Sequence, residues 1–75
     1  KMSNISLLNE LENILNIPKN SLTENDELEL FQDWDSIAFF ELSVVLDKNF
    51  NLQVKPQDIK NFKYVKDILE LVNLK

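Results

Sequence analysis

The chain contains neither cysteine nor histidine, and this restricts how its 75 residues can be stabilised and what chemistry they can perform. Disulfides and thiolate chemistry are excluded, and the commonest metal ligand and general base is missing. A domain of this length buries only about 60 to 65% of its unfolded surface, so it has room for one hydrophobic core. We therefore expect a single domain over residues 1–75 that holds no metal and is not an enzyme.

Hydrophobic residues make up 44% of the chain and are evenly spread. That content is too high for intrinsic disorder, and no apolar run is long enough for a membrane span. No signal sequence is visible, because Asn and Glu interrupt the N-terminus before an apolar stretch develops. We expect a soluble, cytoplasmic protein without membrane insertion, and we expect Lys1 to be an addition in front of a native start at Met2.

Acidic residues concentrate in the middle third of the chain. The formal net charge is −5, and no lysine or arginine occurs from Ser21 to Asp47. The acidic residues of this stretch are Glu24, Asp26, Glu27, Glu29, Asp33, Asp35, Glu41 and Asp47. Binding to a phosphate backbone needs clustered Lys and Arg residues. This chain has no strongly basic segment, so nucleic acid is not an expected partner. The acidic stretch favours either solubility or the steering of a basic partner.

Apolar spacing and capping residues predict an all-α fold with four helical segments, three long and a short third one. The segments begin at Ser3 or Asn4, at Asp35 or Ser36, at Pro56 and at about Lys63, and the long ones end near Pro18, Asn49 and Leu74. The stripes predicted to be buried in the first and last helices are Leu7, Leu8, Leu11, Ile14 and Leu15, and Val65, Ile68, Leu69 and Val72. Residues 20–33 predict an ordered loop with a helical turn, anchored by Leu22, Leu28, Leu30 and Phe31. Because glycine is absent, asparagine is expected to make the tight turns.

The predicted second helix has two apolar faces. The first, which we assign to the core, consists of Phe39, Leu42, Leu46 and Phe50, with Ala38 and Val45 at one margin. The second lies nearly opposite and consists of Ile37, Phe40 and Val44, flanked by Ser36, Glu41, Asp47 and Lys48. Two interpretations fit this pattern: a central helix buried on both sides, or a patch on which apolar residues and carboxylates dock a partner.

Asp35 and Ser36 stand at the predicted start of this helix, and both are favoured N-cap residues worth about 1 kcal/mol. The positive end of the helix dipole and the free N–H groups there also favour an anion such as a phosphodiester, by about 0.3 to 1 kcal/mol. Ser36 therefore fits two roles, a helix cap and the bearer of a phosphate-linked group.

The segment Asp35-Ser36-Ile37 resembles the Asp-Ser-Leu attachment motif of acyl carrier proteins. The similarity continues without a gap through Glu41-Leu42, Leu46, Phe50, Val54, Asp58-Ile59, Phe62, Val65 and Val72. The resemblance implies a four-helix bundle and a 4'-phosphopantetheine arm, which a phosphopantetheinyl transferase joins to Ser36 from coenzyme A. The thiol of the arm would hold acyl intermediates as thioesters, in fatty-acid synthesis or in a specialised acyl-transfer pathway.

The same resemblance assigns roles to other residues. Cofactor binding falls to Ser36 with Asp35 beside it, and the expected partner contacts are Asp35, Ile37, Phe40, Glu41, Val44 and Asp47. The expected border of an acyl pocket is Leu46, Ile59, Phe62 and Ile68, although plain core packing explains these four equally well. The expected partners are the phosphopantetheinyl transferase and enzymes with basic docking patches, which are acyl- or aminoacyl-ligases, acyltransferases or synthases. We expect the protein itself to be a monomer.

Some positions depart from the family pattern. Asp33 and Trp34 precede the motif where the family commonly has glycine two residues before the Asp, and Lys48 stands where an acid is frequent. The Thr that usually caps the last helix is absent, so Asn61 is expected to cap it. Trp-Asp-Ser occurs in carriers of specialised pathways. Two alternatives stay open: an aminoacyl carrier of D-alanyl or peptidyl type, and an interaction module without a prosthetic group.

Overall fold

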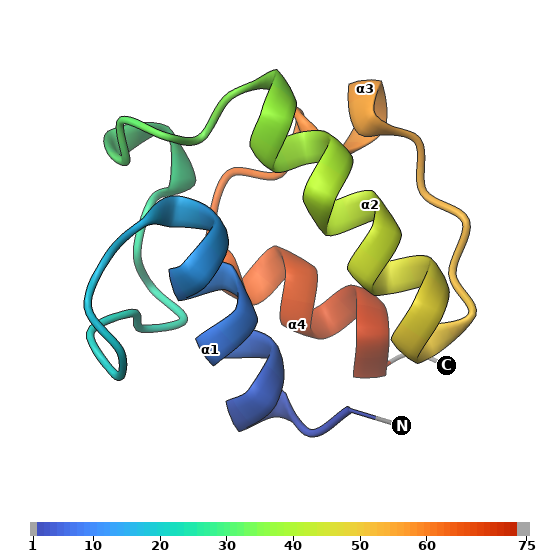
Figure 1. Ribbon diagram of the computed structural model, residues 1–75, viewed down its shortest axis with the longest axis horizontal. Coiled ribbons are helices and arrows are strands. Elements are labelled where there is room, and N and C mark those ends of the chain that lie inside the picture. The colour runs from blue at the N-terminus through green and yellow to red at the C-terminus, as the bar shows by residue number, and fades with distance from the viewer. Residues whose placement is uncertain (1, 74–75) are drawn as a thin grey trace.

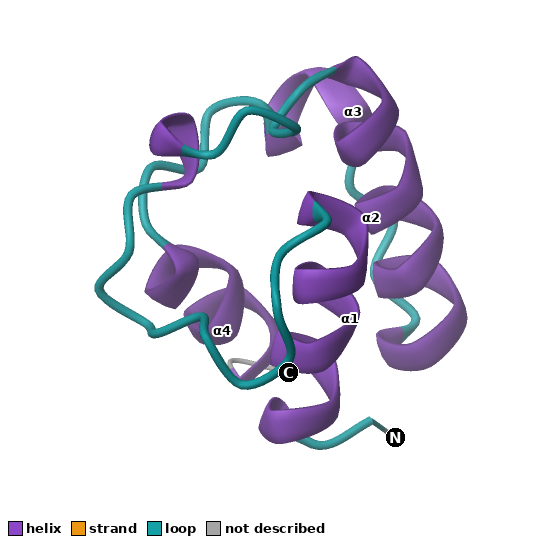
Figure 2. Cartoon of the chain, turned by 60° about the vertical axis from the view of Figure 1, so that its left-hand side comes forward, coloured by secondary structure: helices purple, strands orange, loops and turns teal. Residues whose placement is uncertain are grey.

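The computed structural model describes residues 2–73 and consists of four α-helices joined by loops (Figure 1, Figure 2). The helices are α1 (Asn4–Leu15), α2 (Ser36–Phe50), α3 (Pro56–Ile59) and α4 (Val65–Asn73), and a short 3-10 helix, η1 (Leu28–Leu30), lies between α1 and α2. The predicted all-α fold with a short third helix is confirmed. The expectations for Lys1 and for Leu74 lie outside the described residues. No described helix is long and apolar enough to cross a membrane.

All four helices contribute to one hydrophobic core, and α2 packs against both α1 and α3. The buried stripes of α1 and α4 are Leu7, Leu11, Ile14 and Leu15, and Val65, Ile68, Leu69 and Val72. These are the predicted residues, except that Leu8 is only partly buried. Each of these helices thus buries one apolar stripe and keeps its polar residues at least partly exposed, with Glu12 of α1 as the exception.

Asparagine residues end the two longest helices, as expected for a chain without glycine. Asn16 after α1 and Asn51 after α2 adopt left-handed backbone, with φ of 58° and 55°. Asn20 does the same in the following loop, with φ of 67°. Asparagine tolerates this region better than other residues with a side chain, so it can reverse the chain here.

The start of α4 differs from the prediction that Asn61 caps it. The helix begins at Val65, and the Asp67 carboxylate in its first turn accepts the N–H groups of Lys63 and Tyr64, at 3.0 and 2.9 Å. The N–H groups of the next two residues, 65 and 66, donate to the carbonyl oxygens of residues 26 and 24, at 3.1 and 2.9 Å. Backbone from the distant loop and a carboxylate within the helix therefore replace the expected cap.

The loop between α1 and α2 is held in place by Leu22 and Leu28, which are both buried. Leu30 is 78% exposed, so the prediction that it anchors the loop is wrong. With three residues per turn in η1, a side chain two positions after the buried Leu28 points away from the core. The N–H of Leu28 donates to the carbonyl of Lys63 at 2.9 Å and joins this loop to the segment before α4.

Glu12 is a buried carboxylate on α1, only 2% exposed, that also holds this loop. Its Oε2 accepts the N–H of Leu22 at 2.9 Å, while Oε1 has no partner among the described residues. Burial alone would raise the pKa of this carboxyl, but backbone N–H groups of residues 20–22 and the nearby Lys19 outweigh burial and lower the pKa below its ordinary value. The ionised carboxylate is therefore the form that stabilises the fold.

Candidate functional site

The predicted attachment residue, Ser36, is the first residue of α2 and is exposed. Asp35 precedes it as the N-cap, and its Oδ1 accepts the N–H groups of Ile37 and Ala38, at 3.1 and 3.0 Å. The cap is thus Asp35, and the Ser36 hydroxyl is not needed for it. Among the described residues Ser36 Oγ has no hydrogen-bond partner, so this oxygen is open to chemistry from outside.

The capping geometry corrects one part of the electrostatic expectation for Ser36. Two of the N–H groups expected to be free for a phosphodiester are occupied by the Asp35 carboxylate. What is left for an anion on Ser36 is the helix dipole, which favours it by about 0.3 to 1 kcal/mol, and this is partly offset by the neighbouring negative charge.

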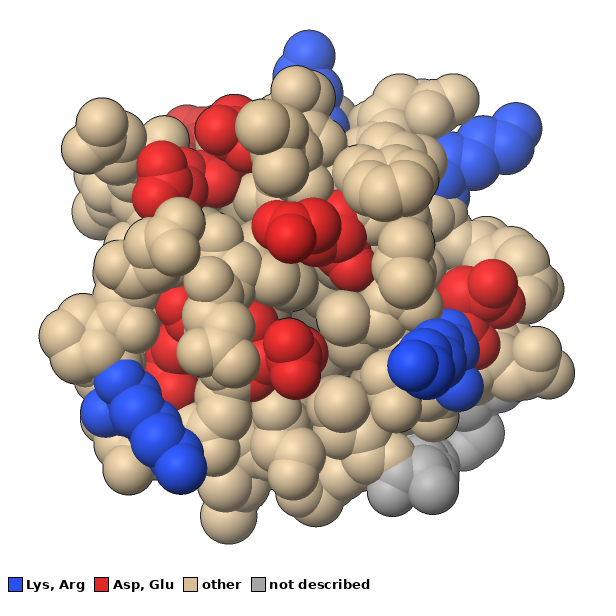
Figure 3. All heavy atoms as spheres, in the orientation of Figure 1, with Lys and Arg blue, Asp and Glu red and all other residues tan. Residues whose placement is uncertain are grey.

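The outer face of α2 combines exposed apolar residues with carboxylates. Ile37, Phe40 and Val44 are 69%, 61% and 47% exposed, which excludes burial of the helix on both sides. Asp35, Glu41 and Asp47 are exposed as well, and Gln53 Nε2 donates to Asp47 Oδ1 at 2.6 Å. In the view of Figure 3, acidic side chains lie near the centre of the face that α1 and α2 form. The predicted partner contacts thus share one accessible surface, although their use by a partner stays a prediction.

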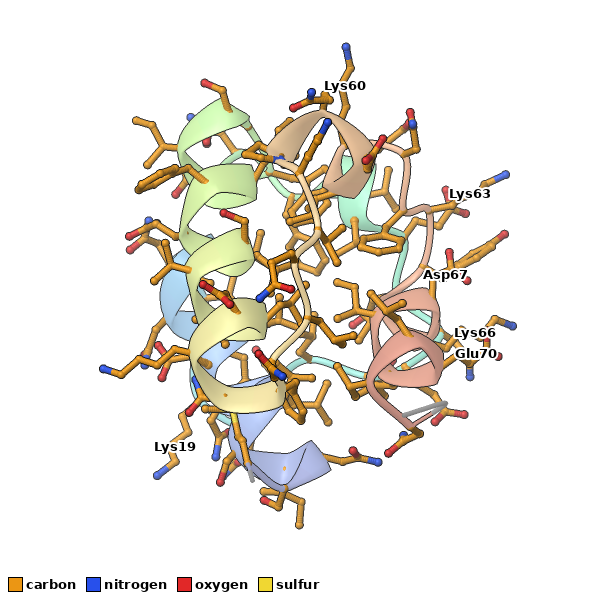
Figure 4. All side chains as sticks on the ribbon, turned by 90° about the vertical axis from the view of Figure 1, so that its right-hand side faces the viewer. Lys19, Lys60, Lys63, Lys66, Asp67 and Glu70 are labelled. Atoms are coloured by element: carbon orange, nitrogen blue, oxygen red, sulfur yellow. The ribbon has the colours of Figure 1, made fainter. Side chains whose placement is uncertain are left out.

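Lysines lie mainly elsewhere on the molecule. Figure 4 shows Lys63 and Lys66 on the side of α4, away from α2, with Lys60 at the end of α3. The ammonium groups of Lys63 and Lys66 lie 5.5 and 5.2 Å from the centre of the Tyr64 ring. Asp67 and Glu70 lie on the same side of α4 as these two lysines (Figure 4), so that side carries charges of both signs, whereas the carboxylates on the outer face of α2 give it a negative field that can orient an approaching basic partner.

The inner face of α2 consists of Ala38, Leu42, Leu46 and Phe50, all buried. The sequence predicts Ala38 at the margin of this face, but Ala38 is only 1% exposed. It predicts Phe39 in the core, but Phe39 is only partly buried. Phe39 instead contacts Trp34 edge to face, with ring centres 4.9 Å apart. The buried arc is therefore rotated slightly from the predicted one, because the aromatic pair covers the start of the helix.

The residues predicted to border an acyl pocket pack together in the core. Leu46, Ile59 and Ile68 are fully buried, and Phe62 is partly buried. An open hollow of about 500 Å³ lies beside Phe62, Trp34 and Phe39, with Lys60, Asn61, Lys63 and Glu29 around it. Whether the four core residues shelter a cargo stays a prediction, and core packing accounts for their positions.

The family described as "Phosphopantetheine attachment site" matches residues 6–72, from α1 to α4. The chain belongs to this family. No curated protein and no solved structure matches the chain significantly. Phosphopantetheine-binding domains carry 4'-phosphopantetheine covalently, and they are typically carriers without catalytic activity of their own.

The start of α2 fits the prosthetic group of this phosphopantetheine-binding family. An arm needs a hydroxyl that an enzyme can reach, and Ser36 is exposed with its Oγ unbonded within the described chain. It also needs a position at which the growing phosphodiester does not displace packed side chains, and Ser36 is exposed, whereas the side chains that enter the core from this part of α2 are Ala38 and Leu42. An exposed hydroxyl at the first position of α2 therefore meets both requirements, while attachment of the group to Ser36 stays a prediction.

Several residues of this region were not found from the sequence. Glu12 was not among the residues predicted to be buried in α1, and only its contact with the backbone of residues 20–22 shows its role. Glu10 and Ile14 of α1 line a hollow together with Phe40, Glu41 and Val44 of α2. No sequence signal pairs α1 with the outer face of α2, because helical periodicity gives a buried arc but not the neighbouring helix.

Proposed function

We propose that this protein is an acyl carrier that bears the 4'-phosphopantetheine arm on Ser36 and presents acyl groups to partner enzymes. The observation that supports the proposal is the free, exposed Ser36 hydroxyl at the first position of α2, in a chain of the phosphopantetheine-binding family. When bound, the arm supplies a thiol on which acyl groups are held as thioesters. The protein itself positions the arm and offers the surface that enzymes recognise.

The docking surface of the proposed carrier is the outer face of α2. Exposed Ile37, Phe40 and Val44 provide apolar area for contact. Asp35, Glu41 and Asp47 surround them and carry the charges that attract basic patches on a transferase, a ligase or a synthase. Which pathway the carrier serves depends on which of these enzymes it meets. The same arrangement of arm and helix would serve fatty-acid synthesis, a specialised acyl-transfer pathway or aminoacyl transfer.

Intact-mass measurement after incubation with coenzyme A and a phosphopantetheinyl transferase tests the attachment. We expect the mass of one phosphopantetheine group to be added to the wild-type protein and none to Ser36→Ala. Ser43→Ala is the matched control, because Ser43 lies on the same helix but its hydroxyl donates to the carbonyl of Phe40. An unmodified wild-type protein with a transferase that is active on another carrier would overturn the proposal and favour an interaction module without a prosthetic group.

A further inference from the structure

A groove runs between α1 and α2, next to the outer face of α2. It consists of two hollows of about 140 and 270 Å³ that share Ile14 and Glu41. The smaller hollow reaches Asp35 and Ile37, the neighbours of Ser36 in the sequence, and the larger one extends along Phe40 and Val44. The groove is therefore continuous with the proposed docking surface and adds residues of α1 to it.

The floor of the groove is apolar and its rim is acidic. Ile14, Ala38 and Val45 supply apolar surface from the two helices. The rim carries four carboxylates, Glu10, Asp33, Asp35 and Glu41, and no described residue lining either hollow is a lysine. Figure 3 shows acidic side chains on both sides of a hollow near the centre of this face.

Two of the rim carboxylates are already held in place, Asp35 as the N-cap of α2 and Asp33 by a side chain of α1. Asn16 Nδ2 donates to Asp33 Oδ2 at 2.8 Å and connects the end of α1 to the segment before α2. Glu10 and Glu41, which face the larger hollow from the two helices, have no such bond among the described residues. These two carboxylates are the ones available to a partner.

We propose that this groove receives a long basic side chain, an arginine, from the transferase that modifies Ser36. The aliphatic part of such a side chain packs on an apolar floor while its charged end stays at a polar rim, here between Glu10 and Glu41. An enzyme whose active site reaches Ser36 Oγ must also cover Asp35 and Ile37, which line the mouth of the groove. The inference rests on the proposed carrier function and assigns part of the recognition to α1.

Charge reversal on α1 tests this assignment. Glu10→Lys places a positive charge at the groove without altering α2, and Glu70→Lys makes the same change in net charge at an exposed position of α4. The measurement is kcat/KM for arm addition by the transferase with coenzyme A, over a series of salt concentrations. We expect Glu10→Lys to lower kcat/KM roughly five- to tenfold at low salt and Glu70→Lys to change it less than about twofold.

The outcomes separate this inference from the carrier function. If Glu10→Lys behaves like Glu70→Lys while arm addition to the wild type proceeds, the groove assignment fails and the carrier function stands. If no arm is added to the wild type, the carrier function itself fails. Sedimentation of the wild type alone gives a third result: salt-sensitive dimers that Glu10→Lys abolishes would show that a second copy occupies the groove, which overturns the proposal. Circular dichroism of each variant checks that the helices are retained.

Discussion

The inner and outer faces of α2 carry similar apolar side chains in opposite environments. Leu42 and Leu46 on the inner face are fully buried, while Ile37 and Phe40 on the outer face are more than half exposed, at 69% and 61%. The inner residues stabilise the bundle by leaving water. The outer ones bury much less of their surface on folding, and carboxylates surround them. The comparison shows that apolar content alone does not distinguish a residue that stabilises the fold from one that serves a partner.

The largest expected difference between the two faces is in stability. Leu46→Ala removes a fully buried side chain and should lower the free energy of unfolding by about 2 to 5 kcal/mol. Val44→Ala, two residues away and 47% exposed, should lower it by less than about 0.5 kcal/mol. Urea unfolding followed by circular dichroism measures both. Similar losses in the two variants would mean that the outer face is also part of the core.

The stability that the buried carboxylate of Glu12 contributes should depend on pH. Because the pKa of Glu12 is lowered in the folded protein, its ionised form contributes stability above the ordinary carboxyl pKa, and this is lost as the pH falls through the folded value. Glu12→Gln should cost about 1 to 2 kcal/mol at neutral pH and progressively less as the pH falls below the ordinary carboxyl pKa and through the lowered folded value. Urea unfolding at several pH values gives the profile. A constant difference between variant and wild type down to pH 3 would contradict the role of the ionised carboxylate.

The smallest expected effect on stability comes from charge reversal on the outer face. Glu41→Lys should change the free energy of unfolding by less than about 0.5 kcal/mol, because Glu41 is exposed. It should nevertheless weaken association with a basic partner enzyme and reduce the salt dependence of the association rate. Stopped-flow binding over a salt series measures this. If rate and salt dependence match those of the wild type, Glu41 does not belong to the contact surface.

Most of the fold could be predicted from local signals. Ser3 caps α1, Pro56 begins α3, and the stripe of Val65, Ile68 and Val72 is buried in α4, all as expected from capping chemistry and helical period. Leu30 could not be placed, because a short 3-10 turn has a different period from an α-helix. The replacement of the Asn61 cap could not be foreseen either, since it depends on carbonyl groups some forty residues away.

The site was predictable where it depends on one helix and not where it depends on two. The exposure of Ile37, Phe40 and Val44 follows from the periodicity of α2 alone. The buried face of α2 differs from the predicted one, since Ala38 is inside it and Phe39 is at its edge. The reason is that Trp34 packs on Phe39 and shifts the boundary of the buried surface. Glu10 belongs to the groove only because α1 lies against α2, and this pairing is a property of the tertiary structure.

Trp34 gives the protein a built-in optical probe. It is the single tryptophan of the chain, it stands two residues before Ser36, and its indole nitrogen is buried against the head of α2 without a described hydrogen-bond partner. Its emission therefore comes from one known place, beside the residue to which we propose that the arm is attached. Events at that end of the helix can be followed in real time by fluorescence on the unlabelled protein, without a dye that would alter its surface.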